Sequence, residues 1–161
     1  MTTMMDIAHP EQAMQAGVAQ FAQASTPYHI KRAGSRPLRF EGSELAMAMS
    51  FTPAIPYWYE INVYRTAQQS FVAAVRLFHQ AEDRQDTVRA WEAASLDDAI
   101  EKLISYDAAH DVSLGVEFDV TTAPASETGA LALQLLARIS DIRHHYHSLV
   151  GEFLYDLENG H

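Results

Sequence analysis

The sequence contains no cysteine among its 161 residues. Disulfide bonds and thiolate metal sites are therefore excluded, which suits a protein of a reducing compartment. No apolar run approaches the roughly 20 residues that a membrane-spanning helix needs. The first residues also lack the basic stretch and the apolar stretch of a signal peptide. We therefore expect a cytoplasmic protein with no membrane partner.

Motifs that identify the common enzyme classes are missing as well. The sequence has no glycine-rich phosphate loop, no dinucleotide-binding fingerprint and no sharp turn around a nucleophilic serine, so we expect no cofactor. Basic residues are scarce, with 11 Lys and Arg against 21 Asp and Glu and a net charge of −10. That balance disfavours polyanionic partners. Residues 27–91 nevertheless carry eight bases and six acids, so the acidity lies mostly in residues 92–161.

The length and composition of the chain predict one globular domain over residues 1–161. Apolar residues make up 48% of the sequence and charged residues 20%, which is ordinary for a folded domain with a core. A helical period is followed by a period of two and then by further helical periods. This order predicts an α+β fold, with an antiparallel four- to five-stranded meander sheet packed by helices on one face.

The expected elements follow from the apolar spacing and from turn residues. Pro10 suits the first turn of an N-terminal helix. Ser95 can cap a later helix, with Asp98 where a capping box places an acid. The basic stretch Lys31–Arg39 reads as a loop or edge segment. The expected helices cover 10–24, 95–107 and 128–157; the sheet covers 38–92, with strands near 45–51, 57–66, 71–79 and 87–92; and 112–120 is a candidate further strand.

The last helix carries a heptad seam, which predicts a homodimer. A helix of about 30 residues is roughly 45 Å long, whereas one short strand spans roughly 15–20 Å. A second copy of the chain is a simple way to cover the remaining apolar face. The alternative is a helix that lies diagonally over its own sheet. The seam residues are Leu135, Ile139, Ile142, Tyr146, Leu149 and Phe153.

Strand side chains alternate between the two faces of a sheet, so their parity sorts them. One parity class is almost wholly apolar and is expected to face the helices: Tyr59, Ile61, Val63, Phe71, Ala73, Val75, Leu77, Val88 and Ala90. The other class mixes large aromatic residues with arginines, and its expected ligand-binding members are Trp58, Asn62, Tyr64, Arg76, Arg89 and Trp91.

Aromatic rings beside guanidinium groups on a sheet are typical of platforms for unpaired bases or other extended ligands. The hypothesis is a homodimeric binding module for single-stranded nucleic acid or an extended chain. Two alternatives stay open: a protein interface, where Trp, Tyr and Arg are enriched, and ordinary packing under a second layer of the same chain. The cations expected to steer a ligand are Lys31, Arg32, Arg36 and Arg39.

Part of this sequence is similar to an uncharacterised bacterial protein family. The pattern comprises Phe40-x-Gly42-x-x-Leu45-Ala46, then Trp58-x-Glu60-Ile61, then Tyr64-Arg65-Thr66. The resemblance covers about a quarter of the chain and implies no assigned activity. The order of four strands followed by a helix also resembles the Whirly and transcriptional-coactivator single-stranded-DNA-binding domains, which implies a nucleic-acid-binding sheet.

Two features support an enzyme or a metal-binding protein as the alternative. Glu60 lies mid-strand among aromatic residues, where burial can raise the pKa of a carboxyl group; pairing with Arg76 or Arg89 is the simpler expectation. The segment His144–His147 places imidazoles on one helix, and Asp141 with His145 forms an i,i+4 pair that can hold zinc. No second ligand helix is evident, so solvated histidines are the simpler interpretation and we expect no bound metal.

Overall fold

The computed structural model describes residues 25–114 and 124–160, and the expected helix over 10–24 lies outside them. The described residues of the candidate strand over 112–120 form a turn and irregular backbone. The observed elements are β1 (Thr26–Arg32), β2 (Ser35–Met49), β3 (Tyr57–Thr66), β4 (Phe71–His79), β5 (Thr87–Ala93), α2 (Leu96–Ser105), a 3₁₀ turn η1 (Ala108–His110) and α3 (Ala125–Asn159).

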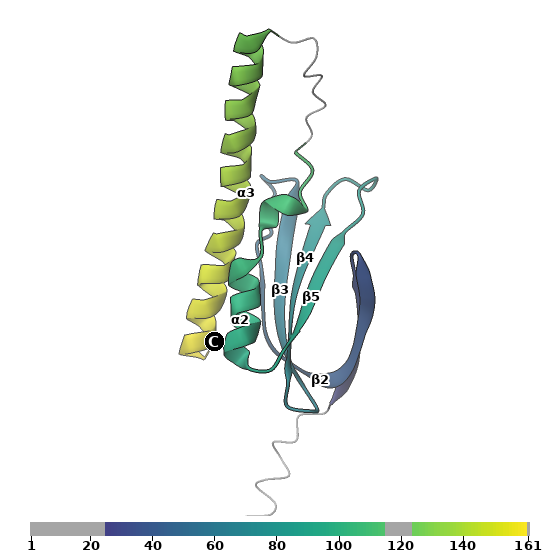
Figure 1. The fold of residues 1–161 in the computed structure, drawn as a ribbon. Coiled ribbons are helices and arrows are strands. Elements are labelled where there is room, and N and C mark those ends of the chain that lie inside the picture. Colours follow the sequence, from purple (N-terminus) through teal and green to yellow (C-terminus); the bar gives the residue numbers. More distant parts are fainter. Residues whose placement is uncertain (1–24, 115–123, 161) are drawn as a thin grey trace, which may run out of the picture.

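The five strands form one antiparallel meander in the order β1-β2-β3-β4-β5, which confirms the expected α+β fold. Figure 1 shows α2 and α3 on one side of the sheet and the β1–β2 hairpin curling over the other. The stretch Lys31–Arg39, expected as a loop or edge segment, joins the edge strand β1 to β2 as a hairpin with a turn at Gly34, whose φ is 68°. Glycine reaches that left-handed conformation without steric cost.

Strand β2 is long because it belongs to two parts of the sheet. Its first half pairs with β1 and its second half pairs with β3, and the two halves meet near Gly42. The β3 backbone passes so close to Gly42 that an added Cβ would collide with the carbonyl oxygen of Arg65. A register shift between Glu44 and Ala46 leaves Leu45 as an extra residue, and such bulges bend a strand. Together these features let the sheet curl into a half-barrel.

The helix-covered face of the sheet is the main core. Tyr59, Ile61 and Val63 of β3 are fully buried there, as the parity argument predicted. Ile142, Tyr146, Leu149 and Phe153 of the predicted seam are buried against the same core. The hydroxyl of Tyr146 donates a 2.7 Å hydrogen bond to the carbonyl oxygen of Leu103 in α2, which fixes the two helices together.

The two helices begin and end close to where the sequence predicted. The Ser95 hydroxyl oxygen accepts a 3.1 Å hydrogen bond from the Asp98 amide, which confirms the expected cap of α2. Helix α3 has 35 residues, and its N-terminal half extends beyond the sheet and α2 in Figure 1. Its buried residues all lie between Ile142 and Phe153. No helix in the described ranges combines the length and apolar character needed to cross a membrane.

The concave side of the sheet holds a second, smaller core beneath the β1–β2 hairpin. Ile30 and Leu38 of the hairpin pack on Val72, Ala74 and Ala90. The turn of the hairpin reaches the last strand, where the Ala33 amide donates to the Val88 carbonyl oxygen over 2.8 Å. The first and last strands of the meander therefore meet, and the hairpin covers one part of the concave face.

Candidate functional site

The uncovered part of the concave face carries large apolar side chains that water reaches. After the bulge, Met47 pairs with Asn62 and Met49 with Glu60, so both methionines point to the concave side. Met47, Met49 and Phe51 are 53%, 47% and 58% exposed. We call these three residues, together with Trp58 and Phe78, the open apolar patch. Large exposed apolar patches on a protein surface are often interaction sites.

The rings of the open apolar patch are held in a fixed arrangement. Trp58 and Phe78 face each other across β3 and β4 and stack with ring centroids 5.5 Å apart. Phe51 meets Trp58 edge-on at 5.2 Å. Trp58 is half-buried, so its indole presents part of its surface to solvent. Of the aromatic residues predicted to form a ligand platform, Trp58 alone lies at this end of the sheet, stacked on Phe78.

Polar side chains lie beside the open apolar patch with part of their hydrogen-bonding capacity unused. The Arg76 guanidinium Nε is 3.6 Å from Glu60 Oε1, which is the pairing that the sequence made the simpler expectation for Glu60. Asn62 is 3% exposed, and its Nδ2 donates to Glu44 Oε1 over 2.7 Å. Among the described residues, Asn62 Oδ1 and Arg76 Nε are buried without a hydrogen-bond partner. Each such group costs about 1–3 kcal/mol until it is satisfied.

Tyr64 belongs to the same face but is covered by the hairpin. It is 3% exposed, and the rings of Tyr28 and Phe40 lie over it with centroids 4.7 Å and 5.5 Å away. Covering by a second layer of the same chain was one of the alternatives at the sequence level, and it applies to this residue. Tyr64 therefore contributes to the small core rather than to an open surface.

Arg89 and Trp91 were predicted on the wrong face. Trp91 pairs with Ala73 and Arg89 with Val75, which are both on the helix-covered side. Val88 and Ala90, which the parity argument placed against the helices, lie in the small concave core instead. A shift of one residue in strand phase exchanges the faces of every side chain. The sequence placed six ligand residues on one surface, and the structure divides them between two.

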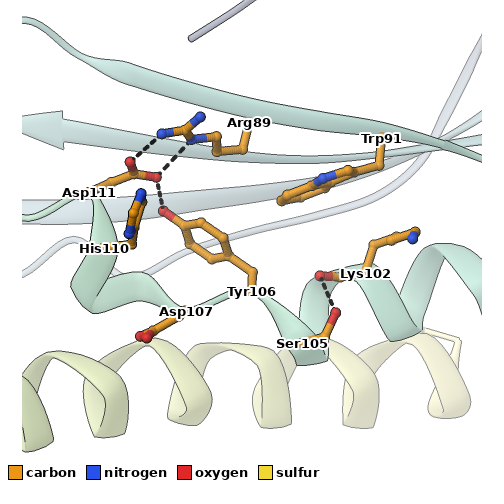
Figure 2. Close-up of a pocket in the computed structure, with 8 residues that line it drawn as sticks. All are labelled: Arg89, Trp91, Lys102, Ser105, Tyr106, Asp107, His110 and Asp111. Atoms are coloured by element: carbon orange, nitrogen blue, oxygen red, sulfur yellow. Dashed lines mark hydrogen bonds and ion pairs between the residues drawn. The ribbon is translucent and has the colours of Figure 1, made fainter. Parts of the chain in front are cut away.

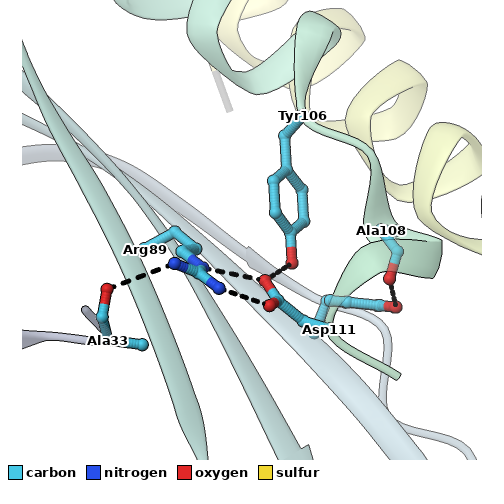
Figure 3. A network of polar contacts seen from close by, with 6 residues as sticks. Ala33, Arg89, Tyr106, Ala108 and Asp111 are labelled. Carbon is cyan, nitrogen blue, oxygen red and sulfur yellow. Dashed lines mark hydrogen bonds and ion pairs between the residues drawn. The ribbon is translucent and has the colours of Figure 1, made fainter. Parts of the chain in front are cut away.

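Arg89 is the centre of a polar network that ties three segments together (Figure 3). Its Nε and Nη2 donate to Asp111 over 2.9 Å and 2.6 Å, and its Nη1 donates to the Ala33 carbonyl oxygen over 3.1 Å. The Tyr106 hydroxyl donates to Asp111 Oδ2 over 2.6 Å. Burial opposes ionisation of Asp111, but the hydrogen bonds from Arg89 and Tyr106 outweigh it and hold the pKa of Asp111 below its usual value. Arg89 thus works as a structural clamp.

A cavity of about 420 Å³ opens beside this network (Figure 2). Trp91 forms one wall and the ring of Tyr106 another, with centroids 5.9 Å apart. Of its charged residues, Arg89 and Asp111 pair with each other and Asp107 pairs with Arg143. Lys102 and His110 complete the charged lining. The size is that of a small-molecule site, but its main polar groups are already engaged with one another.

The four predicted steering cations lie on the β1–β2 hairpin, away from the open apolar patch. Arg39 pairs with His29. Its neighbour Leu38 faces the small core, so the side chain of Arg39 lies on the outer face of the hairpin. Arg32 Nε donates to the Arg36 carbonyl oxygen over 2.7 Å and its Nη1 to the Ala90 carbonyl oxygen over 3.2 Å. Lys31 and Arg36 are exposed. Among the described residues, the hydrogen bonds of Arg32 are therefore to the hairpin itself and to β5.

The histidine segment of α3 is spread around the helix. His144 and His147 are exposed, whereas His145 is half-buried and its Nε2 lies 3.0 Å from the Ser50 hydroxyl oxygen. Burial lowers the pKa of His145. Ser50 Oγ also accepts a 2.9 Å hydrogen bond from the Tyr59 amide, so the pair fastens α3 to the end of β2. Across the described residues, no group of three His, Asp or Glu side chains is arranged to hold a metal ion.

The sequence argument overlooked the methionines as site residues. It placed Met47 and Met49 in a strand with alternating small residues, and that alternation was the available signal. Alanine at 46 and 48 faces the core, whereas methionine at 47 and 49 lies on the solvent-exposed side, where the usual pattern of apolar-in and polar-out places polar residues.

Comparisons with known proteins leave the resemblances untested. Searches against models of protein families, against curated proteins and against solved structures each gave no match for this chain. The similarity to Whirly-type domains therefore stays a prediction, and functional inference rests on the surfaces of the molecule itself.

Proposed function

We propose that this protein is a cytoplasmic, homodimeric binding module that takes an extended polypeptide segment on its open apolar patch, and that it does not act as an enzyme. The observation that carries the proposal is the exposure of Met47, Met49 and Phe51 around the stacked pair Trp58 and Phe78. Methionine side chains are flexible and polarizable, and they suit surfaces that accept varied apolar partners.

The neighbouring strand edge favours an extended ligand. β1 pairs with β2 only as far as Gly42, so within the described ranges Ser43–Met49 has a strand neighbour on its β3 side alone. An exposed strand edge can accept another chain by adding a strand, with main-chain hydrogen bonds giving affinity and side-chain pockets giving specificity. The edge and the open apolar patch share Met47 and Met49, so a single bound segment can use both.

The charges near the patch favour a polypeptide over nucleic acid. Phosphate contacts supply most of the sequence-independent affinity for nucleic acid, yet the steering cations lie on the hairpin and Arg76 faces Glu60. The buried Asn62 Oδ1, which has no hydrogen-bond partner among the described residues, lies on the same sheet face. A docked segment that rearranges this region can satisfy it, which adds a favourable contribution to binding.

Helix α3 supports the dimer part of the proposal. Leu133 and Leu136 are 70% and 62% exposed, and none of the described residues from Ala125 to Asp141 is buried. Residues 125–137 carry a single charge, Glu127, so a partner needs few opposite charges to pair with this surface. A helix that is apolar over most of its surface is normally buried. A second copy of α3 supplies a matching uncharged surface, because a two-fold interface pairs a patch with itself.

The peptide arm of the test uses a library of short linear peptides. After selection against the full chain, the best peptide is titrated while tryptophan fluorescence is followed. We expect binding that a Met47→Ser/Met49→Ser double variant loses and that a matched Ile104→Ser/Tyr155→Ser variant, also at exposed apolar positions, keeps. Single-stranded oligothymidylate at low salt is titrated in parallel, and we expect no change in fluorescence.

Three results would contradict the polypeptide proposal. Salt-dependent oligonucleotide binding would favour nucleic acid, and failure to select any peptide would remove the ligand hypothesis. If only a variant that lacks residues 1–24 bound peptide, the chain's own N-terminal segment would be the partner of this face.

The dimer is tested separately by light scattering. We expect Leu133→Glu/Leu136→Glu to be monomeric and the control Tyr155→Glu, exposed on the same helix, to stay dimeric.

A further inference from the structure

A second cavity, of about 250 Å³, lies at the far end of the sheet from Gly42. Four segments of the chain meet there: the start of β3, the β4–β5 connection, the turn that follows η1, and α3. Its residues are Pro56, Tyr57, His79, Ala81, Arg84, Val112, Ser113 and Arg138. The volume is at the low end of small-molecule sites, so it suits a small ligand.

The chemistry of the lining is unusual for this protein. Arg84, Arg138 and His79 supply positive or protonatable groups, and Tyr57 and Ser113 supply hydroxyls. Among the residues that the structure describes, no carboxylate lines the cavity. The whole chain has about twice as many acids as bases, with 21 against 11. Carboxylates do occur close by. The charge of Asp141 helps to raise the pKa of Tyr57, and Asp86 Oδ1 accepts a hydrogen bond from the His79 amide. Glu82 and Asp83 are on the exposed β4–β5 connection. None of these four lines the cavity itself.

The donors around the cavity are largely free. Three ion pairs join described residues, and none of them involves Arg84 or Arg138. Arg138 Nη1 donates to the Leu114 carbonyl oxygen over 2.8 Å, which anchors the guanidinium and leaves its other N–H groups available. Burial raises the pKa of Tyr57, with Arg138 opposing that effect, so the phenol keeps its proton and can donate.

We propose that this cavity binds a small phosphate group, held by Arg84 and Arg138 with hydrogen bonds from the hydroxyls of Tyr57 and Ser113. A tetrahedral oxyanion fits better than a planar carboxylate, because the donors come from four separate segments rather than from one plane. Arginine forks pair with phosphate oxygens in a charge-assisted, bidentate manner. The site is separate from the open apolar patch, so it represents a second binding activity that does not depend on the peptide proposal.

The test is a calorimetric titration of the full chain with two probes, inorganic phosphate and glycerol 3-phosphate, at low ionic strength. Loss of one charge-assisted contact weakens binding by about tenfold or more, so we expect this change in Arg84→Gln. Arg84→Lys keeps the charge but loses the fork, and we expect partial recovery. Arg36→Gln removes the same charge from an exposed position on the hairpin and should leave binding unchanged.

The two probes distinguish the sources of the phosphate group. Tighter binding of glycerol 3-phosphate identifies a phosphate monoester as the ligand class, and equal or tighter binding of inorganic phosphate identifies the free ion. Circular dichroism of each variant confirms that it folds. The proposal is overturned if neither probe binds the wild-type protein, if Arg36→Gln weakens binding as much as Arg84→Gln, or if sodium chloride at matched ionic strength abolishes binding in all variants alike.

Discussion

The two faces of the curled sheet are built in different ways. On the helix-covered face, α2 and α3 close over residues such as Tyr59 and Val75, and the polar groups at its margin are paired, as in the Arg89–Asp111 network. On the concave face, the described residues cover only part of the surface with the first hairpin, and Met47 and Met49 are exposed. The first face stabilises the fold, whereas the second keeps exposed apolar surface, on which the proposed binding function depends.

The largest expected effect on stability is the loss of a large side chain from the core of the helix-covered face. Phe153 is buried at the centre of the helix-covered face, and Phe153→Ala should lower the free energy of unfolding by about 3–5 kcal/mol. Tyr155→Ala, on the exposed side of the same helix, should change it by less than about 0.5 kcal/mol. Urea unfolding measures both. Similar losses in the two variants would show that α3 is buried on all sides.

A substitution at the bend that creates the concave face should lower the stability almost as much. Gly42→Ala places a Cβ against the Arg65 carbonyl oxygen, and this overpacking should cost about 3 kcal/mol. The matched control is Gly151→Ala in α3, where a Cβ meets open space and better helix propensity should add about 0.5–1 kcal/mol. Chemical denaturation of the pair checks the opposite signs. Equal effects would mean that β2 does not cross β3 closely at this point.

The third largest loss of stability should come from breaking the clamp of Arg89 and Asp111 at the margin of the helix-covered face. Asp111→Asn removes the charge that receives hydrogen bonds from Arg89 and Tyr106, and hydrogen bonds to charged groups contribute about 2 kcal/mol. Asp107→Asn breaks a pair with Arg143 in which both side chains are largely exposed, so we expect a smaller loss there. Thermal unfolding compares the two variants. A larger loss for Asp107→Asn would contradict the clamp.

The same clamp predicts a dependence on pH. The pKa of Asp111 is lower in the folded protein than the unfolded value of about 3.9. Its stabilisation is therefore complete above the unfolded pKa and is lost as the pH falls through the folded pKa. The stability difference between the wild type and Asp111→Asn should shrink below about pH 4. A difference that stays constant down to pH 2 would show that the carboxylate is not responsible.

The contrast between the faces also explains what the sequence could reveal. Period two in β3 and β4 identified the helix-covered face, because Tyr59 to Val63 and Ala73 to Leu77 have apolar residues at every second position. The phase of β5 was assigned wrongly because the concave side is also partly a core. Val88 and Ala90 looked suited to the helices, but an apolar strand residue fits either of two buried faces. The register across the β4–β5 connection decides between them.

The candidate site depended on long-range features that local spacing does not contain. The seam of α3 was recognisable from its spacing, but spacing could not show that Ile142, Tyr146 and Phe153 pack against the chain's own sheet and α2. The basic residues of Lys31–Arg39 left a loop and an edge segment equally open, and nothing local showed that β1 pairs with β2. Without knowledge of that hairpin, the sequence could not show that Tyr64 is covered while Trp58 stays partly exposed. The resemblance pattern contained Gly42, whose close approach to Arg65 only the fold reveals.

The smallest effect is expected on the open apolar patch. Met49→Ser removes a large apolar side chain that is 47% exposed, so the free energy of unfolding should change by less than about 0.5 kcal/mol, as for ordinary surface positions. Urea unfolding at low protein concentration provides the measurement. A loss above about 1 kcal/mol would show that another part of the chain covers Met49 in the folded protein, because only buried apolar surface contributes at that level. The concave face would then be a second closed core with no surface left for a partner, and the distinction between the two faces would disappear.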